Sequence, residues 1–336
     1  LEVFADRVCL KNEYRYNDTT LPKGSRLVSI NNIAIEDIFS HAQQFVGGET
    51  EILRQHTVAA RFPIMLWAVF GLKEQFRLVV SVEGEEQLVY INGGQNWQPV
   101  NPLPDAANDD FVYYRLNNHT GYLKVATFDV SPDWFESFID DTFRTINQQN
   151  VHNLIIDIRD NTGGNTDTAT YLARHLALAP FRMISSLQER LNTDNRGLFN
   201  YRGNKGDVLK EEWNEWQTPI DSAQRFNGNA YVLISPVSYS SAIVFATAVQ
   251  DNAMATLVGR ETGGYANQTA QGNLFNLPNS ELRAYVATRL LVRPSGDLRV
   301  RGVVPDITVT ATTGQIQAGE DADMLAALEH AELLQR

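Results

Sequence analysis

From residue 113 onward, the pattern of hydrophobic and polar positions changes regularly between two periods. Some segments are apolar runs typical of strands within a sheet, and the segments between them repeat apolar residues at helical spacing. Strand patterns occupy residues 120–128, 153–158 and 229–235, and helical patterns occupy residues 132–149, 167–178 and 241–250. Strands that alternate with helices predict an α/β fold in which helices pack on a mostly parallel sheet.

The earlier part of the chain has a different pattern. Residues 1–35 read as short strands separated by polar turns, and residues 36–72 repeat apolar positions at helical spacing. Residues 76–93 form two alternating runs around a Glu-Gly-Glu-Glu turn, which predicts a hairpin. The apolar run "FPIMLWAVFGL" at 62–72 is shorter than the roughly 20 residues that span a bilayer, so we expect a buried helix and no transmembrane segment there.

Two polar segments divide the chain. The stretch "QPVNPLPDAANDD" is rich in Pro, Asn and Asp and predicts a domain boundary, with one domain over residues 1–110 and another over residues 111–336. Residues 180–227 carry many charges and aromatic rings but few apolar runs. We expect this second segment to be an inserted flap that covers an active site.

Composition narrows the class of protein. The 336 residues carry a formal net charge of −12 without a run rich in Lys or Arg, so nucleic acid and anionic membranes are poor candidate partners. The single cysteine, Cys9, excludes an internal disulfide and a cysteine-based metal cluster. No H-E-x-x-H motif and no pair of histidines at helical spacing is present. We therefore expect neither a metal nor another cofactor.

The first turn with possible chemistry follows the predicted strand at 153–158. In "IIDIRDNTGGN", Gly163 and Gly164 let backbone N–H groups point outward without side-chain obstruction, as the binding of an anion or oxyanion requires. The simpler interpretation is a tight turn without a ligand. A dinucleotide site would need G-x-G-x-x-G or a P-loop lysine, and both are missing.

The second such turn is "SYSS", between the strand at 229–235 and the helix that follows. Ser240 lies at this strand-to-helix corner, as the nucleophile of a nucleophile elbow does, although G-x-S-x-G is absent. The start of a helix supplies free N–H groups that stabilise an oxyanion. Against this interpretation, Ser238, Ser240 and Ser241 are all good helix caps.

Taken together and in order, these motifs resemble those of the tail-specific (C-terminal processing) serine peptidases and their tricorn-like and retinoid-binding-protein-like relatives. The resemblance covers most of residues 20–330. The matching blocks are "LPKGSRLVSINN", which resembles a strand of a PDZ-like domain, then "TGYLKVATF", "LIIDIRDNTGG", "VLISPVSYSSAIVFATAVQDNAMATLVGRETGG", "RGVVPDI" and a terminal helix after "GEDADMLAAL". The resemblance implies a ClpP/crotonase-like core with a parallel-rich sheet, preceded by a β-rich PDZ-like domain with a helical insertion.

The resemblance also implies roles for individual residues. The family's nucleophile corresponds to Ser240, and its oxyanion donors correspond to the backbone N–H groups of Ser241, Gly163 and Gly164. The serine–lysine branch has its lysine base where this chain has Tyr265, for which we expect a role in substrate binding. A tyrosine with an ordinary pKa near 10 is a poor base at neutral pH.

The general base is therefore missing from its expected place. Lys210 is the last lysine, so a lysine base would require Lys205 or Lys210 to fold back from the flap. The six histidines have no recognisable catalytic setting: they are His41, His56, His119, His152, His175 and His330. In the histidine-using relatives the base tends to come from ahead of the PDZ-like part, so we expect a catalytic histidine upstream of Leu1.

Two further positions depart from the family's pattern. The tricorn-like branch has a glutamate shortly before "GV-PD", whereas this chain has Arg299 and Arg301 in that segment. Arg260 similarly replaces the family's usual glutamate in "GE-T". Both departures concern support for the mechanism and leave the nucleophile unaffected.

These patterns predict a serine-type endopeptidase that acts by acyl transfer through Ser240. We expect its PDZ-like domain to capture an extended peptide or protein substrate by strand addition. The resemblance further implies an exported protein, periplasmic or at the cell surface, whose signal segment is not in this chain. Two alternatives stay open: a catalytically inactive relative that binds peptides or apolar ligands, and a nucleotide-binding α/β enzyme.

Overall fold

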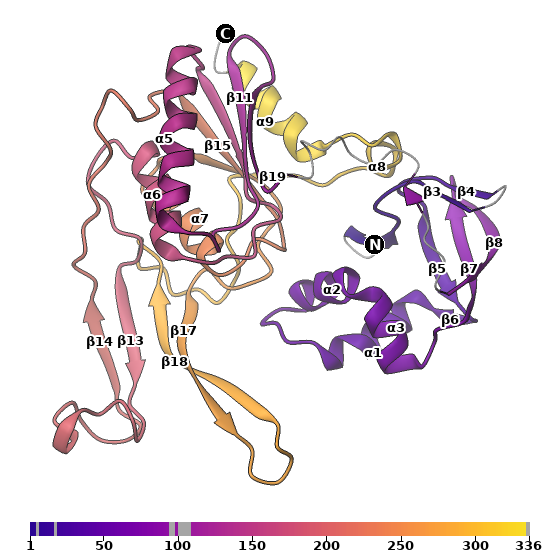
Figure 1. Cartoon of the computed structure of the whole chain (residues 1–336), viewed down its shortest axis with the longest axis horizontal. Coiled ribbons are helices and arrows are strands. Elements are labelled where there is room, and N and C mark those ends of the chain that lie inside the picture. Colours follow the sequence, from indigo (N-terminus) through magenta and orange to yellow (C-terminus); the bar gives the residue numbers. More distant parts are fainter. Residues whose placement is uncertain (5–6, 17–18, 94–97, 100–108, 334–336) are drawn as a thin grey trace.

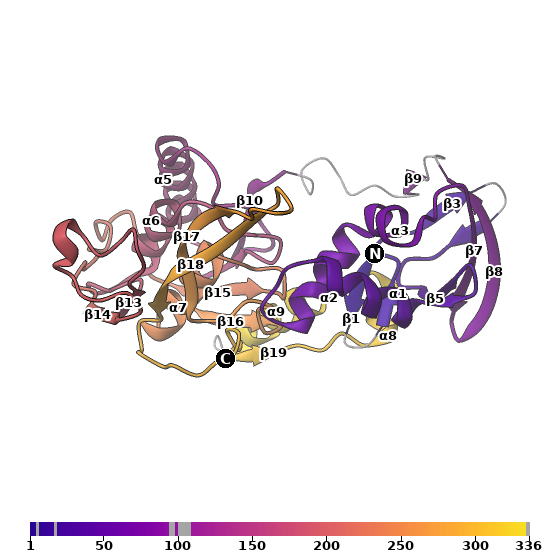
Figure 2. The ribbon, with the colours of Figure 1, turned by 90° about the horizontal axis from the view of Figure 1, so that it is seen from below.

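The computed structural model describes residues 1–4, 7–16, 19–93, 98–99 and 109–333. Two groups of elements lie side by side in it (Figures 1 and 2). The first group comes from the first 99 residues, and the second comes from residue 111 onward. Within the described residues, none of the helices combines the length and the apolar character needed to cross a membrane.

The first group is a sheet with the strand order β1-β2-β5-β7-β8, against which three helices pack (Figure 1). The hairpin predicted at 76–93 is confirmed as β7 and β8. Its elements are β1 Glu2–Phe4, β2 Arg7–Cys9, β3 Tyr14–Tyr16, β4 Thr19–Leu21, β5 Arg26–Ile30, β6 Ile33–Ala34, α1 Ile35–Ala42, η1 Gln43–Phe45, α2 Glu51–Ala60, α3 Phe62–Phe70, β7 Gln75–Val82, β8 Glu85–Asn92 and β9 Gln98–Pro99.

The apolar run at 62–72 forms a helix as predicted, α3, but the expectation of full burial is wrong. Met65 and Leu66 pack into the first hydrophobic core. On the opposite side of the same helix, Ile64 is 57% exposed and Trp67 is 62% exposed. The continuous run of apolar letters conceals a helix with only one buried side.

The second group centres on a six-stranded sheet in the order β10-β11-β12-β15-β16-β19. Only β10 is antiparallel to its neighbour, so the predicted parallel-rich α/β core is confirmed. Its strands and flanking helices are β10 Phe111–Arg115, β11 Thr120–Val125, α5 Pro132–Gln148, β12 Asn153–Asp157, α6 Thr166–Leu176, β15 Asn229–Ile234, α7 Ser241–Asp251, β16 Thr256–Gly259, β19 Ile307–Thr308, α8 Thr313–Ala318 and α9 Ala322–Leu333.

Both faces of this sheet are covered, which explains its continuous apolar strands. Alternate residues such as Leu154 and Ile156 point into the core under α5, α6 and α7. Ile155, between them, belongs to a smaller cluster under α9 on the other face (Figure 1). This arrangement brings the turns after β12 and β15 to the same edge, because the two strands are parallel neighbours.

A second sheet projects from this core in the order β14-β13-β18-β17 (Figure 1). The segment predicted as an inserted flap contributes two of its strands, and two strands from near the C-terminal end complete it. The elements are β13 Ser186–Arg190, η2 Leu198–Asn200, β14 Val208–Glu212, β17 Gln268–Asn276 and β18 Arg283–Val292.

The C-terminal part of the chain returns to the first group of elements. Helix α8 lies beside it in both ribbon views (Figures 1 and 2). Arg7 donates a hydrogen bond to Thr313 at 3.0 Å, and a Cβ at Gly24 would lie only 2.8 Å from Cγ2 of Ile316. The two groups are therefore joined by packing as well as by the chain.

Candidate active site

Ser240 occupies a sharp turn between β15 and α7. Its backbone has φ 55° and ψ −124°, a left-handed conformation that is rare for a residue with a side chain. It is the N-cap residue of α7, yet its hydroxyl makes no capping hydrogen bond. The side chain is half-buried. This geometry is that of a nucleophile elbow, and it disfavours the interpretation of Ser240 as an ordinary helix cap.

The other serines of this turn have structural surroundings. The Ser238 hydroxyl donates to the carbonyl of Ile158 at 2.8 Å and accepts a hydrogen bond from the N–H of Ser235. Ser241 is buried, and its hydroxyl has no hydrogen-bond partner among the described residues. Ser240, by contrast, is half-buried, and its hydroxyl makes no capping hydrogen bond in the part of the chain that the structure describes.

The Gly-rich turn after β12 lies against the turn of Ser240. A Cβ at Gly163 would lie 2.6 Å from the Cβ and 3.1 Å from the Oγ of Ser240, so only glycine fits there. Asn161 joins the two turns, because its carbonyl accepts a hydrogen bond from the N–H of Tyr239 at 3.0 Å. Neither Asn161 nor Tyr239 can be identified as a site residue from the sequence alone.

The predicted oxyanion donors differ in availability. The N–H of Gly163 donates to the Oδ1 of Asn161 at 2.8 Å, so in this structure it is not free to bind an oxyanion. The N–H of Ser241 is the first of helix α7, where no acceptor exists inside the helix. Gly164 follows Gly163 with φ 134° and packs against the backbone of Phe128 and Asp129.

The segment after "GRETGG" also reaches Ser240. Gln268, the first residue of β17, donates from Nε2 to the carbonyl of Ser240 at 2.8 Å. The Tyr265 hydroxyl donates to the backbone carbonyl of Glu49 at 3.4 Å. Sequence reasoning identified Tyr265 but missed Gln268 and Glu49. The amide of Gln268 has no motif of its own, and Glu49 is remote in sequence.

In the described part of the chain, no histidine is hydrogen-bonded to Ser240, and neither is Lys205 or Lys210. Lys210 pairs with Gln188 across β13 and β14. The histidines have other surroundings: His41 lies between Phe45 and Phe70, His119 stacks on His152, His175 is 3.3 Å from Asp140, His330 is 3.3 Å from the Tyr231 hydroxyl, and His56 lines a cavity.

That cavity, of about 940 Å³, lies between the two groups of elements and does not include Ser240. Phe4 and His56 line it from the first group, and Tyr122 and Arg260 line it from the second. Burial, and then the positive charge of Arg260, lower the pKa of His56 from 6.5 to about 4. His56 is therefore neutral at physiological pH.

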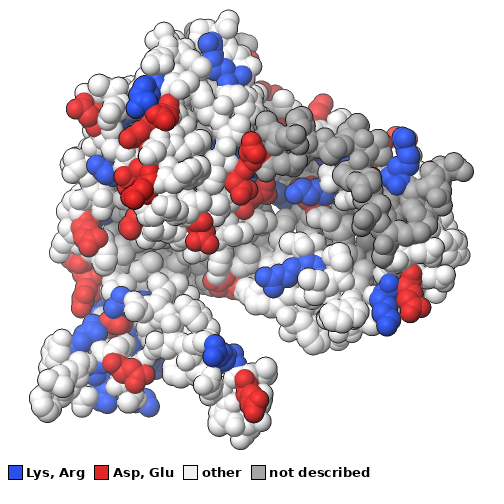
Figure 3. All heavy atoms as spheres, viewed as in Figure 1, with Lys and Arg blue, Asp and Glu red and all other residues white. Residues whose placement is uncertain are grey.

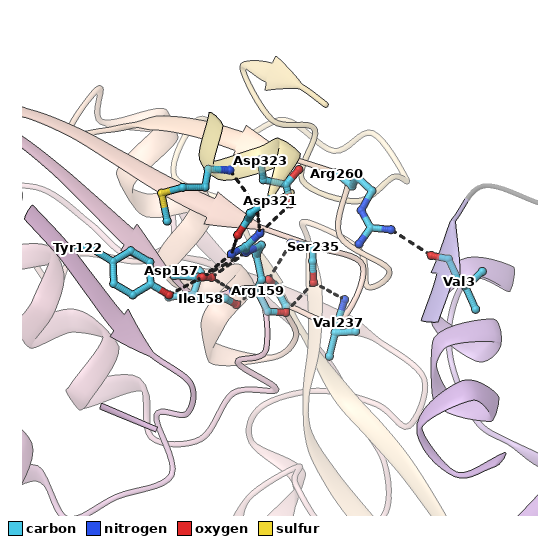
Figure 4. Close-up of polar contacts among 12 residues, drawn as sticks. Val3, Tyr122, Asp157, Ile158, Arg159, Ser235, Val237, Arg260, Asp321 and Asp323 are labelled. Atoms are coloured by element: carbon cyan, nitrogen blue, oxygen red, sulfur yellow. Dashed lines mark hydrogen bonds and ion pairs between the residues drawn. The ribbon is translucent and has the colours of Figure 1, made fainter. Parts of the chain in front are cut away.

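An ionic cluster holds the base of the Gly-rich turn (Figure 4). The guanidinium of Arg159 pairs with Asp157 at 2.7 Å, with Asp321 at 2.7 Å and with Asp323 at 3.2 Å. Burial opposes its charge, but these carboxylates outweigh burial and raise the pKa of Arg159. The carbonyl of Arg159 accepts a hydrogen bond from Ser235 at 2.6 Å. The cluster thus connects both site turns with the start of α9.

The charged surface is mixed. On the face drawn in Figure 3, acidic side chains prevail over much of the core, and several basic side chains gather beside acidic ones on the projecting sheet. Such a surface offers no electrostatic track for a polyanion on that face.

Comparison with known proteins agrees with this geometry. A crystal structure of mature CPAF matches with a TM-score of 0.69 at 14% identity, over 98% of this chain and 82% of that one. Mature CPAF complexed with lactacystin matches with a TM-score of 0.65 at 15% identity, over 98% and 83%. A putative peptidase from Parabacteroides merdae matches with a TM-score of 0.53 at 17% identity, over 89% of each chain. These likenesses establish the fold.

The family is established by the sequence itself. The model of peptidase family S41 matches residues 119–309, more than half of the chain. This range contains both turns of the site, from the strand before the Gly-rich loop to the segment after Tyr265. The chain belongs to peptidase family S41 and is a serine peptidase of the tail-specific kind.

Proposed function

We propose that Ser240 is the nucleophile of this peptidase and attacks the carbonyl of a peptide bond. The general base takes the serine proton and passes it to the leaving amine, the C–N bond breaks, and an acyl-enzyme forms. The observation that carries this proposal is the left-handed backbone of Ser240 at the start of α7, with a hydroxyl that caps nothing. A strained conformation of this kind costs about 1–3 kcal/mol and persists where the surroundings impose it.

The N–H groups of Ser241 and Gly164 are the proposed oxyanion donors. Ser241 supports this role because its N–H stands at the positive end of the α7 dipole. Gly163 then acts through its missing side chain, which lets the loop approach Ser240. The general base of this proposal is the histidine expected outside residues 1–336.

We further propose that residues 1–110 act as a PDZ-like domain that binds an extended stretch of the substrate, and that residues 111–336 form the catalytic core. The exposed edge of the first sheet supports strand addition, since β8 pairs there only with β7 among the described strands. Tyr265 is proposed to contact the substrate beside Ser240. Export of the protein is proposed from the family resemblance.

A fluorophosphonate probe tests the nucleophile directly, because it labels activated serines covalently. We expect Ser240→Ala to abolish labelling and to lower peptide hydrolysis by at least about a thousandfold. Ser222→Ala is the matched control, since Ser222 is exposed on a distant loop, and it should retain both activities. Labelling that survives in Ser240→Ala would refute the assignment.

A further inference from the structure

The loop before α2 in the first group of elements reaches the turn that carries the nucleophile. The Tyr239 hydroxyl donates a hydrogen bond to Oε1 of Glu49 at 2.8 Å, across 190 residues of chain. Tyr239 directly precedes Ser240. A carboxylate of the first group is therefore hydrogen-bonded to the side chain of the residue that directly precedes the proposed nucleophile.

Further contacts fix this loop in place. Thr50 caps α2 by accepting a hydrogen bond from the N–H of Leu53, and its hydroxyl donates to the carbonyl of Gly263. A Cβ at Gly263 would lie 2.9 Å from the Cβ of Leu53, so the two segments touch through their backbones. Arg54 binds the carbonyl of Gly48 at 2.8 Å. Glu49 is thus held between two anchored residues.

Tyr239 is held on several sides. Its N–H donates to the carbonyl of Asn161, and its own carbonyl accepts from the N–H of Ala242. Its ring lies so close to Gly264 that a Cβ there would approach within 2.6 Å. Burial, and then the Glu49 carboxylate, raise the pKa of the Tyr239 phenol, so it stays protonated and donates at neutral pH.

These contacts matter because the next residue is strained. A left-handed non-glycine residue is kept in place only if its neighbours prevent relaxation. The backbone bonds of Tyr239 hold one side of this turn, and the bond of its side chain to Glu49 holds the other. Loss of the Glu49 bond would leave the tyrosine hydroxyl without its acceptor, so that the turn of Ser240 could relax.

We propose that Glu49 is a positioning residue for the hydrolytic reaction, holding the turn of Ser240 through the hydroxyl of Tyr239. The inference rests on the proposed role of Ser240 as nucleophile. It makes the catalytic centre dependent on the docking of the first group of elements, whose loop carries Glu49. A substrate that moves this loop would change the reactivity of the serine.

The test compares Glu49→Ala, Glu49→Gln, Tyr239→Phe and the double variant Glu49→Ala/Tyr239→Phe in the full chain. We measure the rate constant of fluorophosphonate labelling, kcat and KM for a peptide, and thermal unfolding. Glu49→Ala and Tyr239→Phe should each lower labelling and kcat about tenfold with KM unchanged, because a hydrogen bond to a charged acceptor is lost. The double variant should be no slower than either single one.

Two variants separate positioning from a general loss of structure. Glu49→Gln keeps an oxygen that accepts from Tyr239, so it should retain most of the labelling rate. Glu51→Ala removes an exposed acid of the same helix start, whose contact is with Gln55, and should behave as wild type. If Glu49→Ala does not fold, Tyr239→Phe and Glu49→Gln carry the test.

The outcomes that overturn the inference are distinct. Wild-type labelling that depends on Ser240 but is unchanged in Glu49→Ala refutes the role of Glu49 alone. Additive losses in the double variant, or a change confined to KM, refute positioning through Tyr239. Absence of labelling in the wild type, tested together with the segment expected to supply the histidine base, refutes the proposed nucleophile and the inference together.

Discussion

Ser240 is held in its conformation by residues that touch it rather than by its own preference. Gly163 is one of them, since a Cβ added there would lie only 2.6 Å from the Cβ of Ser240. Asn161 supports the same region by bonding the N–H of Gly163 and, through its carbonyl, the N–H of Tyr239. At this scale the site is a set of close contacts that tolerate little added volume.

Gly163→Ala tests this crowding. The new methyl would meet Ser240, so we expect the labelling rate to fall at least tenfold, and the positive φ of 105° adds a cost of about 1 kcal/mol in folding stability. Gly206→Ala is the matched control, because Gly206 has φ 98° but nothing within 4 Å of a Cβ. Equal labelling by the two variants would show that crowding at Ser240 is unimportant.

The contrast between Ser240 and Glu49 shows what the sequence can and cannot predict at this scale. Ser240 was predictable because its signal is local: an apolar strand, a serine turn and a helix follow one another in the chain. Glu49 carries no such signal, because its partner Tyr239 lies 190 residues away and only tertiary packing brings them together. The hydrogen bond from the N–H of Gly163 to Asn161 could not be predicted from the sequence either, since it depends on the orientation of the Asn161 side chain.

At the scale of elements, the decisive arrangement is the parallel pairing of β12 with β15. Continuous apolar strands predicted this sheet correctly, and parallel strands bring their following turns to one edge. The projecting sheet was harder to predict from the sequence, because β13 pairs with β18, which lies about a hundred residues later in the chain. Long-range antiparallel pairing leaves only weak local patterns, which is why the segment read as an irregular flap.

The ionic cluster below the site joins elements that are distant in sequence. Arg159→Ala would leave the 7% exposed Asp157 without its counter-charge, so we expect a loss of about 3–5 kcal/mol in the free energy of unfolding, measured by chemical denaturation. Arg299→Ala serves as the control, because Arg299 pairs with Asp297 at the surface and is 66% exposed. That variant should unfold almost as wild type does. Similar losses in both would contradict a special role for Arg159.

At the scale of the whole molecule, the contact between the two groups of elements is sensitive to acid. His56 has a pKa of about 4 in the folded protein, against 6.5 without burial and Arg260. As the pH falls from 6.5 towards 4, His56 therefore becomes protonated in the unfolded chain but stays largely neutral in the folded protein. The associated stability is fully present above pH 6.5 and is lost across this window.

His56→Gln removes this titration. Between pH 7.5 and pH 4.5, we expect the variant to lose about 1–2 kcal/mol less stability than wild type, a range reduced for the partial exposure of His56. Urea unfolding at the two pH values measures the difference. His119→Gln, a change at an exposed position, should follow wild type. An identical pH dependence in His56→Gln and wild type would show that His56 does not titrate in this way.

The packing of α8 against the first group of elements has a consequence for synthesis. Arg7 and Thr313 are separated by 306 residues, so on a ribosome the first group emerges long before its neighbour α8 exists. The surface of the first group around Gly24 therefore stays uncovered by α8 until almost the entire core has been translated. If docking is completed only then, Glu49 reaches Tyr239 late, and the nascent chain carries an unassembled catalytic centre while it is still being made.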